Sequence, residues 1–439
     1  MLNNPITIIT LLLLLQSCGS GSDSSNDTTT EYEFTLLAKL ANQCGQQTAF
    51  DQLEVHLQDD NWQLINKYSA DVNGQIHFIT EQKEINYTII AKSQQGENEE
   101  GFDIISYYHA NTITPAWYKA TYDSLQDNSN CECVTQDIEL QHRAFSMIDS
   151  ISTSFDYDNS QLIDSQTTYL SDSEVCRIAD SEWPVQSISI KGLDANNNAI
   201  GVASVLENFS SNTENLLQPA AIEVADLVPL PQNHAAFELA QLFKNDEHFY
   251  AEIGEGDEEL LVFNTHPYIS ESTYYAKTSH IYESIDTIFG RSSFSSYHQI
   301  QSNLYDEAFS VLAEIDKPTI DNTSFSELAS DGSYDYSAVS GYPLVKIVFD
   351  YQLNSISSDA SIPVSWTMYG PIKGTLAASV ALSVMEESIG TDSNIQTTDI
   401  KIIKSSNSNN YSDYIGYYQG NTESDLADDL RYYHLQLAL

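Results

Sequence analysis

The sequence predicts an all-β protein with antiparallel β-sandwich domains in tandem and minor helix content. Residue types that favour strands recur along the chain, because Tyr outnumbers Phe by 27 to 16 and Thr, Ser, Ile and Val are frequent. Apolar residues also alternate with polar ones at Leu53, Val55 and Leu57, and again through residues 376–384. At 439 residues with 41% hydrophobic content, the chain has material for roughly two or three domains.

Residues 1–17 have the pattern of a signal peptide. The apolar run at 2–15 is shorter than the ~20 residues that a membrane-spanning helix needs. It ends at Leu15-Gln16-Ser17-Cys18, which resembles the lipobox of bacterial lipoproteins. The resemblance implies cleavage before Cys18 and attachment of lipid, palmitate included, at this cysteine. A buried N-terminal helix followed by an ordinary cysteine is the alternative, and it does not explain the polar segment that follows.

Residues 18–31 are the expected lipidated cysteine and a flexible tether. Residues 19–30 contain only Gly, Ser, Asp, Asn and Thr, so they have no apolar surface whose burial would offset the entropy of ordering. Because Gly19 and not Asp follows the cysteine, the resemblance implies lipid anchoring at the outer membrane of a Gram-negative cell, on its periplasmic or its surface face. The membrane, reached through this lipid, is the first expected partner.

The charge of the chain excludes one class of partner. Only 17 Lys and Arg oppose 63 Asp and Glu, which gives a net charge of −46. Such a field repels phosphate backbones and anionic lipid surfaces, so we expect no nucleic-acid partner.

Residues 32–142 are expected to form a first β-sandwich. Asn73-Gly74, between alternating flanks, predicts a hairpin with a type I′ turn. The order Asp-x-Asn-Gly-x-x-x-Phe at 71–78, followed by Tyr-x-Ile-x-Ala at 87–91, resembles the carboxypeptidase-regulatory-like or transthyretin-like module. The resemblance covers about residues 50–93. It implies a small sandwich without chemistry of its own, completed by strands at 102–108 and 131–140.

Three residues between those last two strands, Pro115, Trp117 and Tyr118, allow two interpretations. They form a ligand platform, or they pack in the core or at a strand edge, which is the commoner fate of such residues.

The chain has four cysteines besides Cys18, and they are expected to form two disulfides because the count is even and the chain is exported. They are Cys44, Cys131, Cys133 and Cys176. Cys131 and Cys133 are too close to bond to each other, so each should reach a separate partner. We favour Cys44–Cys131 and Cys133–Cys176, although the swapped pairing fits nearly as well. In either case Cys176 should join the first sandwich to the second unit.

A zinc site is the alternative for these cysteines, but Cys-x-Cys lacks the usual ligand spacing and has no suitably placed His. We therefore expect no metal ligand and no cofactor in this chain.

Residues 143–231 are expected to form a second β-rich unit. Strands at 185–193 and 199–206 flank a loop in which Asp194, Asn196 and Asn198 are spaced as at the start of an EF-hand loop. Ala199 stands where that loop needs Gly and Val205 where it needs an acid, so the sequence favours a hairpin loop. Residues 232–439 are expected to form a C-terminal sandwich or barrel-like domain, with a short helix at 233–245 and a strand at 414–418.

No catalytic motif of a hydrolase, metalloprotease or nucleotide-binding enzyme is present in the sequence. Adjacent acids such as Glu258 with Glu259 and Asp428 with Asp429 are typical of a solvated surface in so acidic a chain. We therefore expect a protein that is not an enzyme. The alternative is an envelope hydrolase acting on carbohydrate through an unrecognised site.

Adjacent tyrosines allow two interpretations. Exposed Tyr stacks on sugars or packs at protein interfaces, which would give a binding role. Cross-strand packing on the outer face of a sheet is the alternative, and it is the commoner fate of any single pair. On a strand, one Tyr of each pair faces the core and the other is directed outward. The pairs are Tyr107 with Tyr108, Tyr274 with Tyr275, Tyr417 with Tyr418, and Tyr432 with Tyr433. The expected function is a non-enzymatic binding or scaffold role in a lipid-anchored envelope protein, with an envelope protein or polysaccharide as partner.

Overall fold

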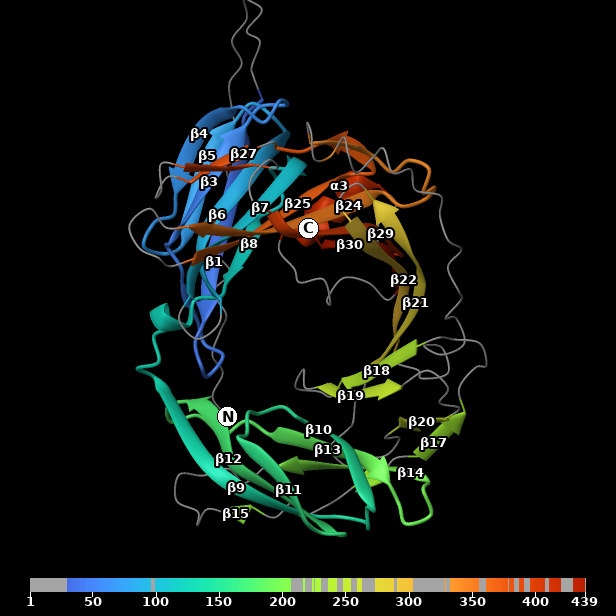
Figure 1. Ribbon diagram of the computed structural model, residues 1–439. Helices are drawn as coiled ribbons and strands as arrows, with labels where there is room; N and C mark the ends of the chain where they lie inside the picture. Colours follow the sequence, from blue (N-terminus) through green and yellow to red (C-terminus); the bar gives the residue numbers. More distant parts are fainter. Residues whose placement is uncertain are drawn as a thin grey trace, which may run out of the picture.

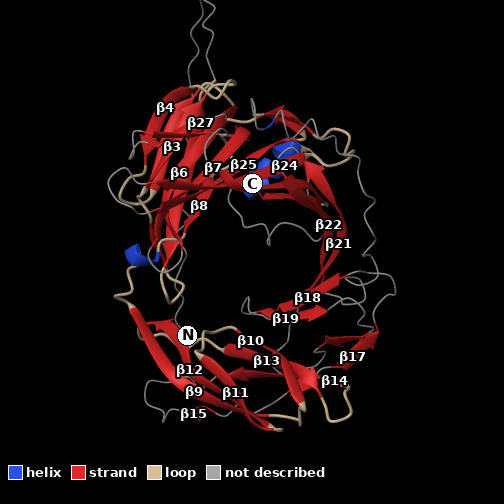
Figure 2. Cartoon of the chain, in the orientation of Figure 1, coloured by secondary structure: helices blue, strands red, loops and turns tan. Residues whose placement is uncertain are grey.

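The computed structural model describes most of the chain after the tether. The described residues are 30–95, 99–206, the strand segments between 216 and 302, 328, 332–354, 361–377, 379–382, 387–390, 395–406, 410–419 and 429–438. The expected signal peptide, Cys18 and nearly all of the tether lie outside them. Strands dominate the described part (Figures 1 and 2), which confirms the all-β class. Within it, no helix has the length and apolar character to cross a membrane.

The first unit is a β-sandwich whose smaller sheet is centred on β1. Strand β1 buries every second side chain, among them Phe34, Leu36 and Ala38, and its other side chains face outward. It pairs antiparallel with β5 and β2 and parallel with β8. The strands of this sheet are β1 (Tyr32–Ala41), β2 (Gln47–Ala49), β5 (Gln75–Thr80) and β8 (Ala116–Ala120).

The second layer of this sandwich is one end of a 12-stranded sheet. Its strands here are β3 (Leu53–Gln58), β4 (Leu64–Ser69), β6 (Glu84–Gln95) and β7 (Glu99–Asn111). The core between the layers includes Phe34 stacked on Phe78 at 4.7 Å and meeting Tyr87 edge-on at 4.9 Å.

The turn at Asn73-Gly74 joins the two layers and does not form the expected hairpin. Its flanking strands are β4, which pairs with β3, and β5, which pairs with β1. Only Gly74 has a positive φ, 71°, whereas a type I′ turn requires positive φ at both central residues. Gly is needed there because a Cβ would collide with the backbone of Ala38 and Phe50.

The same capped loop occurs four times in the described chain. Its first residue, an Asn or Asp, accepts hydrogen bonds at one side-chain oxygen from the backbone N–H groups two and four residues later. The fourth residue has φ between 60° and 75°. The capping residues are Asn42, Asp59, Asp71 and Asp194. The loop at Asp194 forms the predicted hairpin between β13 and β14, whose bounds are Gln186–Leu193 and Ala199–Leu206.

The second unit is a sandwich of two four-stranded sheets around Ile138, Leu140, Leu170 and Ile188. One sheet has the order β11-β12-β9-β15 and the other β10-β13-β14-β16. Their remaining strands are β9 (Cys131–Gln141), β10 (Met147–Thr153), β11 (Asn159–Asp164), β12 (Thr167–Ile178), β15 (Leu216–Leu217) and β16 (Glu223–Val224).

The position of β9 is a correction, because the segment 131–140 was expected to complete the first sandwich. It pairs instead with β12 over ten residue pairs. The alternating residues Val134, Ile138 and Leu140 show that one face is buried but do not reveal which core covers it.

The C-terminal strands extend the large sheet in the order β19-β18-β21-β22-β30-β29-β24-β25-β7-β6-β3-β4. The first sandwich and the C-terminal part therefore share one sheet, which curves through the molecule (Figure 1). The added strands are β18 (Ala236–Leu242), β19 (His248–Ile253), β21 (Thr273–Thr287), β22 (Gly290–Ser302), β24 (Leu344–Asn354), β25 (Ser361–Pro371), β29 (Ile395–Ser405) and β30 (Asp429–Ala438). Short pairs accompany them: β17 (Asp226–Pro229) with β20 (Glu259–Val262), β23 (Ser333–Asp335) with β26 (Lys373–Thr375), and β27 (Ser379–Leu382) with β28 (Glu387–Gly390).

Two secondary-structure predictions in this part are wrong. The helix expected at 233–245 is strand β18, paired on both sides, so its sheet neighbours override a mixed apolar pattern. The strand expected at 414–418 is helix α3 (Tyr411–Tyr418), which Asn410 caps by accepting from the N–H of Asp413. Helix α3 packs on β7 and β25 with Tyr414 and Ile415 buried. The described residues also include a 3-10 turn, η1 (Asp123–Leu125).

The junction between β7 and β25 carries a buried relay of four side chains. Trp366 Nε1 donates to Ser106 Oγ at 3.0 Å, and Ser106 Oγ lies 2.8 Å from Thr88 Oγ1. Thr88 Oγ1 donates onward to Gln58 Oε1 at 2.7 Å. All four residues are buried, so each of these hydrogen bonds replaces one that water would have made.

We expect Ser106→Ala to lower the free energy of unfolding by about 1–3 kcal/mol, because it leaves the Trp366 N–H buried without its acceptor. Denaturant unfolding measures the change. Ser69→Ala, on the exposed side of β4, is the matched control and should change it by less than about 0.5 kcal/mol. Equal stability of the two variants would contradict the structural role of the relay.

Candidate functional site

The four cysteines form two disulfides, as the sequence predicted, and the pairing is the favoured one. Cys44 bonds to Cys131 and Cys133 bonds to Cys176. Their roles are the reverse of those expected. Cys44 lies in the loop between β1 and β2, so the first bond joins the first sandwich to the second unit. Cys133 and Cys176 are direct neighbours on β9 and β12, so the second bond lies within one sheet.

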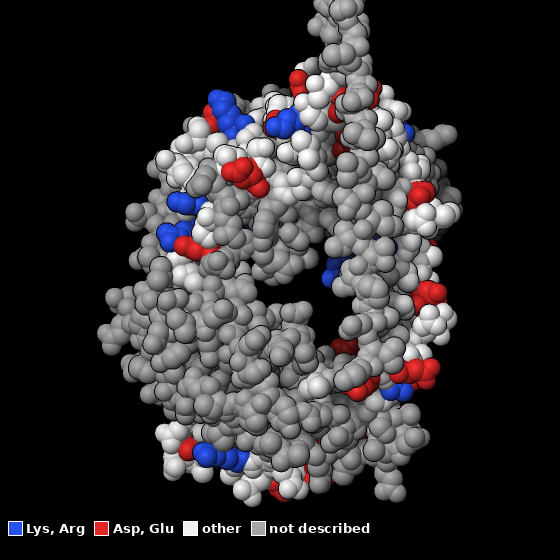
Figure 3. Space-filling view, turned by 180° about the vertical axis from the view of Figure 1, so that it is seen from behind, with Lys and Arg blue, Asp and Glu red and all other residues white. Residues whose placement is uncertain are grey.

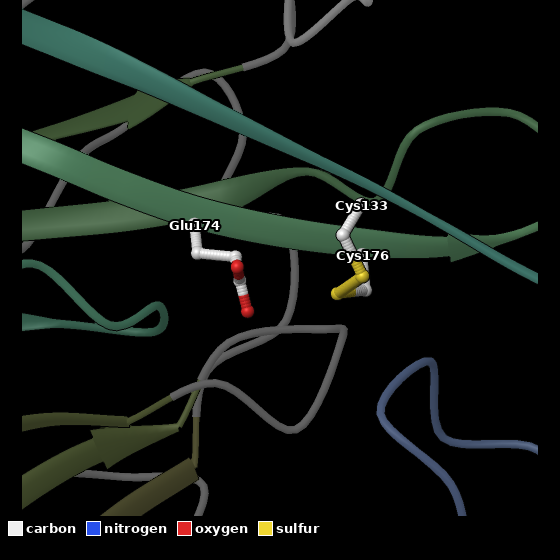
Figure 4. Close-up of side chains that lie close together, drawn as sticks. All are labelled: Cys133, Glu174 and Cys176. Carbon is white, nitrogen blue, oxygen red and sulfur yellow. A yellow bond between two sulfur atoms is a disulfide. The ribbon is translucent and has the colours of Figure 1, made fainter. Parts of the chain in front are cut away.

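One group of potential metal ligands lies at this second disulfide. Cys133, Cys176 and the carboxylate of Glu174 lie within 4.8 Å of one another (Figure 4). Both sulfur atoms are consumed by the disulfide, so neither can act as a thiolate ligand while it is intact. This cluster is therefore a disulfide with an exposed acid beside it.

We expect the oxidised protein to contain no free thiol outside Cys18, and reduction to lower its melting temperature. Each bridge restricts the unfolded chain and should contribute about 2–4 kcal/mol. Peptide mapping without reductant, followed by calorimetry with and without it, measures both. Four free thiols, or zinc retained after dialysis, would show that the cysteines serve a different purpose.

The Asp194 loop has no arrangement for calcium. The carboxylate of Asp194 accepts from the backbone N–H groups of Asn196 and Asn198 and from the Asn198 side-chain amide. These hydrogen bonds, the Asn198 backbone bond foremost, hold the pKa of Asp194 below its usual value. N–H groups thus donate to both carboxylate oxygens of Asp194, whereas a bound cation would need those oxygens as its own ligands.

Among the described residues, the titratable side chains that could act in catalysis are dispersed over the fold. His142 Nε2 lies 2.7 Å from Thr168 Oγ1, a pairing of base and hydroxyl, but Thr168 is 0% exposed and cannot meet a substrate. Burial also lowers the pKa of His142. Of the adjacent acids, Asp429 lies 3.0 Å from His298 Nε2 and pairs with Arg431, which is a structural arrangement at the start of β30.

One face of the large sheet gathers lysines over tyrosine rings, and we call it the lysine–tyrosine face. Three lysine head groups lie 5.3–5.7 Å from ring centroids. The pairs are Lys277 with Tyr297, Lys401 with Tyr432, and Lys346 with Tyr369. The rings of Tyr297 and Tyr432 also stack on each other at 4.7 Å with 14° between their planes.

Strand register places these groups side by side. Lys346 on β24 is opposite Lys401 on β29, and Lys401 is opposite His434 on β30. Tyr432 on β30 is opposite Tyr297 on β22. The intervening residues point to the other face, where they fill a core with Ile347, Ile400, Ile402, Tyr433 and Leu435.

Polar groups complete the lysine–tyrosine face. His434 Nε2 lies 2.9 Å from Asp399 Oδ1, and Thr397 Oγ1 donates to Asp350 Oδ2 at 2.8 Å. At the β7 end, the Tyr118 hydroxyl donates to Asp103 Oδ2 at 2.9 Å. Burial raises the pKa of Asp103, whereas the Tyr118 bond and the charge of Lys346 act to lower it. Tyr369 and Tyr118 are buried, so the accessible part of the face consists of the partly exposed Tyr297 and Tyr432 rings beside Lys401 and His434.

The structure places the four predicted tyrosine pairs in different environments. Tyr433 is buried and Tyr432 lies on the opposite face, as predicted for a strand. Tyr107 is likewise buried, while the partly exposed Tyr108 packs beside Trp62. Tyr417 and Tyr418 belong to helix α3, and the side chains of Tyr274 and Tyr275 lie outside the described residues. No sequence pattern singles out Tyr297 and the three lysines, because strand register alone brings them together.

On the side shown in Figure 3, the acids and bases of the described parts form no single large patch.

Comparisons with known proteins identify no family for this chain, since no family model and no curated protein match it. Two solved structures are similar over part of its length. The major pilin subunit of Bacillus cereus is 8% identical over 60% of this chain and 93% of its own, with a TM-score of 0.14. A DUF3823 family protein from Parabacteroides merdae is 7% identical over 56% and 90%, with a TM-score of 0.14. Scores at this level carry no argument about fold or function.

Proposed function

We propose that this chain is a non-enzymatic, lipid-anchored protein of the cell envelope that binds saccharide on the lysine–tyrosine face. The stacked pair of Tyr297 and Tyr432 is the observation that carries the proposal. Each of these rings has one face against the other ring and a lysine head group over it, so the pair would contact a sugar through ring edges and hydroxyl groups. The neighbouring Lys401, His434 and Asp399 are suited to hydrogen bonds with sugar hydroxyl groups.

The expected location supports this proposal. The resemblance of residues 15–18 to a lipobox and the polar segment after them favour an anchored body on a tether. Such a body meets polysaccharides that are fixed in the envelope.

A hydrolase acting on the same sugars is the weaker proposal. Glycosidases need two carboxylates that flank the scissile bond. On the lysine–tyrosine face, Asp350 is held by Thr397, Asp399 by His434 and Asp103 by Tyr118, which is typical of fixed acceptors.

We expect the double variant Tyr297→Ala/Tyr432→Ala to weaken saccharide binding by about tenfold or more, because each stacked ring contributes about 1 kcal/mol. An array of envelope oligosaccharides identifies a ligand for the full-length protein in detergent, and titration calorimetry measures the change. Tyr169→Ala, on β12 of the second unit, is the control and should bind as the wild type does. No ligand on the array, or equal binding by the double variant, would refute this role of the face.

We expect the Cys18→Ser protein to carry no lipid and to be released from the membrane fraction. Metabolic labelling with a fatty-acid probe, followed by fractionation, measures both effects. Ser17→Ala, which keeps a small residue before Cys18, should remain labelled and membrane-bound. Label retained by the Cys18→Ser protein would remove the lipid-anchor proposal.

A further inference from the structure

A second exposed strip lies on the outer face of the small sheet, on the side away from the large sheet. Trp117 on β8 is 48% exposed there, and Lys119 follows it on the same side of the strand. Register places Leu37 opposite Trp117 and Lys39 opposite Lys119. We call Trp117, Lys39 and Lys119 the β1–β8 strip.

The fold places the two lysines of the β1–β8 strip close enough for their positive charges to repel each other. Neighbouring strands lie about 5 Å apart, so these like charges face each other at close range, and directly opposed like charges destabilise a sheet. Neither lysine forms an ion pair with any described residue. Glu33, an acid on the same face of β1, is six residues earlier, about 20 Å along the strand, and lies 2.9 Å from His77.

Basic residues are also opposed on the large sheet, at Lys346 with Lys401 and at Lys404 with Arg431, so the Lys39–Lys119 pair is distinguished by the exposed Trp117 beside it. Only 17 Lys and Arg stand against 63 Asp and Glu, so an acidic partner for a surface lysine is easily supplied. A group that accepts from both head groups would offset their repulsion, and such a group is an anion.

Trp117 narrows the class of anion. It lies two residues before Lys119, about 7 Å along β8, which brings a flat ring and two ammonium groups within the length of a disaccharide. Strand β8 is held in place at this point, because the Trp117 N–H donates to Gln419 O at 2.6 Å. The strip thus offers stacking for a sugar ring and charge for its neighbour on a fixed strand.

The net charge of the chain favours a polysaccharide over a membrane as the partner of the β1–β8 strip. An anionic membrane surface faces the whole body, whose charge of −46 opposes the approach. A single polysaccharide chain touches only the strip, and charges more than about 10 Å away are screened.

We propose that the β1–β8 strip binds an acidic polysaccharide, with Trp117 stacked on a sugar ring and Lys39 and Lys119 sharing one carboxylate. This site is separate from the lysine–tyrosine face and does not depend on the function proposed for that face.

Titration of the full-length protein in detergent with oligogalacturonate tests the proposal. We expect Lys39→Gln/Lys119→Gln and Trp117→Ala each to weaken binding by about tenfold or more. Methyl-esterified oligogalacturonate lacks the negative charges, so it should bind the wild type only weakly. Its affinity for the wild type should equal the affinity of oligogalacturonate for the double lysine variant. Lys83→Gln, at an exposed lysine that likewise has no ion pair among the described residues, should leave binding unchanged.

The thermal stability of each variant without ligand is measured alongside, and relief of the repulsion should leave the double lysine variant at least as stable as the wild type. The proposal is overturned if the wild type does not bind oligogalacturonate, if the ester binds equally well, or if the lysine variant binds unchanged. Vesicles of anionic lipid, added to the Cys18→Ser protein, test the competing partner. The strip would be assigned to a membrane if the protein binds these vesicles, loses that binding in the double lysine variant, and does not bind the oligosaccharide.

Discussion

The parallel pairing of β7 with β25 is the interaction on which the rest of the structure depends. It joins residues near 104 to residues near 366 and makes one sheet out of the first sandwich and the C-terminal strands. Both faces of this junction are buried. Tyr107 stacks on Tyr369 at 5.2 Å on one face, and Trp366 packs near Phe349 in the core on the other. The polar relay through Ser106 stabilises this register, because a shift of β25 would separate Trp366 from its acceptor.

This junction also positions the lysine–tyrosine face. The face is the continuation of the sandwich interior beyond the cover of the small sheet and helix α3. Where the cover ends, apolar residues give way to lysines, acids and rings on the same side of the sheet. One sheet therefore provides a dry core at one end and a polar, aromatic surface further along, and its position relative to the first sandwich follows from hydrogen bonding alone.

Local features of this fold could be predicted from the sequence and long-range ones could not. Alternation at Leu53, Val55 and Leu57 identified β3. The number and spacing of the cysteines predicted two disulfides and favoured the observed pairing, although the swapped pairing fitted nearly as well. The same alternation cannot tell which core covers a strand, so β9 was assigned to the wrong sandwich. Asn73-Gly74 marked a turn correctly, but a capped loop of this kind serves a hairpin at Asp194 and a change of sheet at Asp71. The lysine–tyrosine face had no local signal, because its three lysine–tyrosine pairs come from six strands spread over residues 273–438.

The distance along the chain between β7 and β25 has a consequence for how the protein folds. Ser106 and Trp366 are 260 residues apart, so the edge of β7 has no partner until most of the chain has been synthesised. Contacts at such separation are slow to form, and an unpaired strand edge with Tyr107 beside it is a template for aggregation in the meantime. The first sandwich therefore spends part of its folding time with an exposed sheet edge. A chaperone that covers unpaired strands would act at this stage, before the C-terminal half arrives to close the sheet.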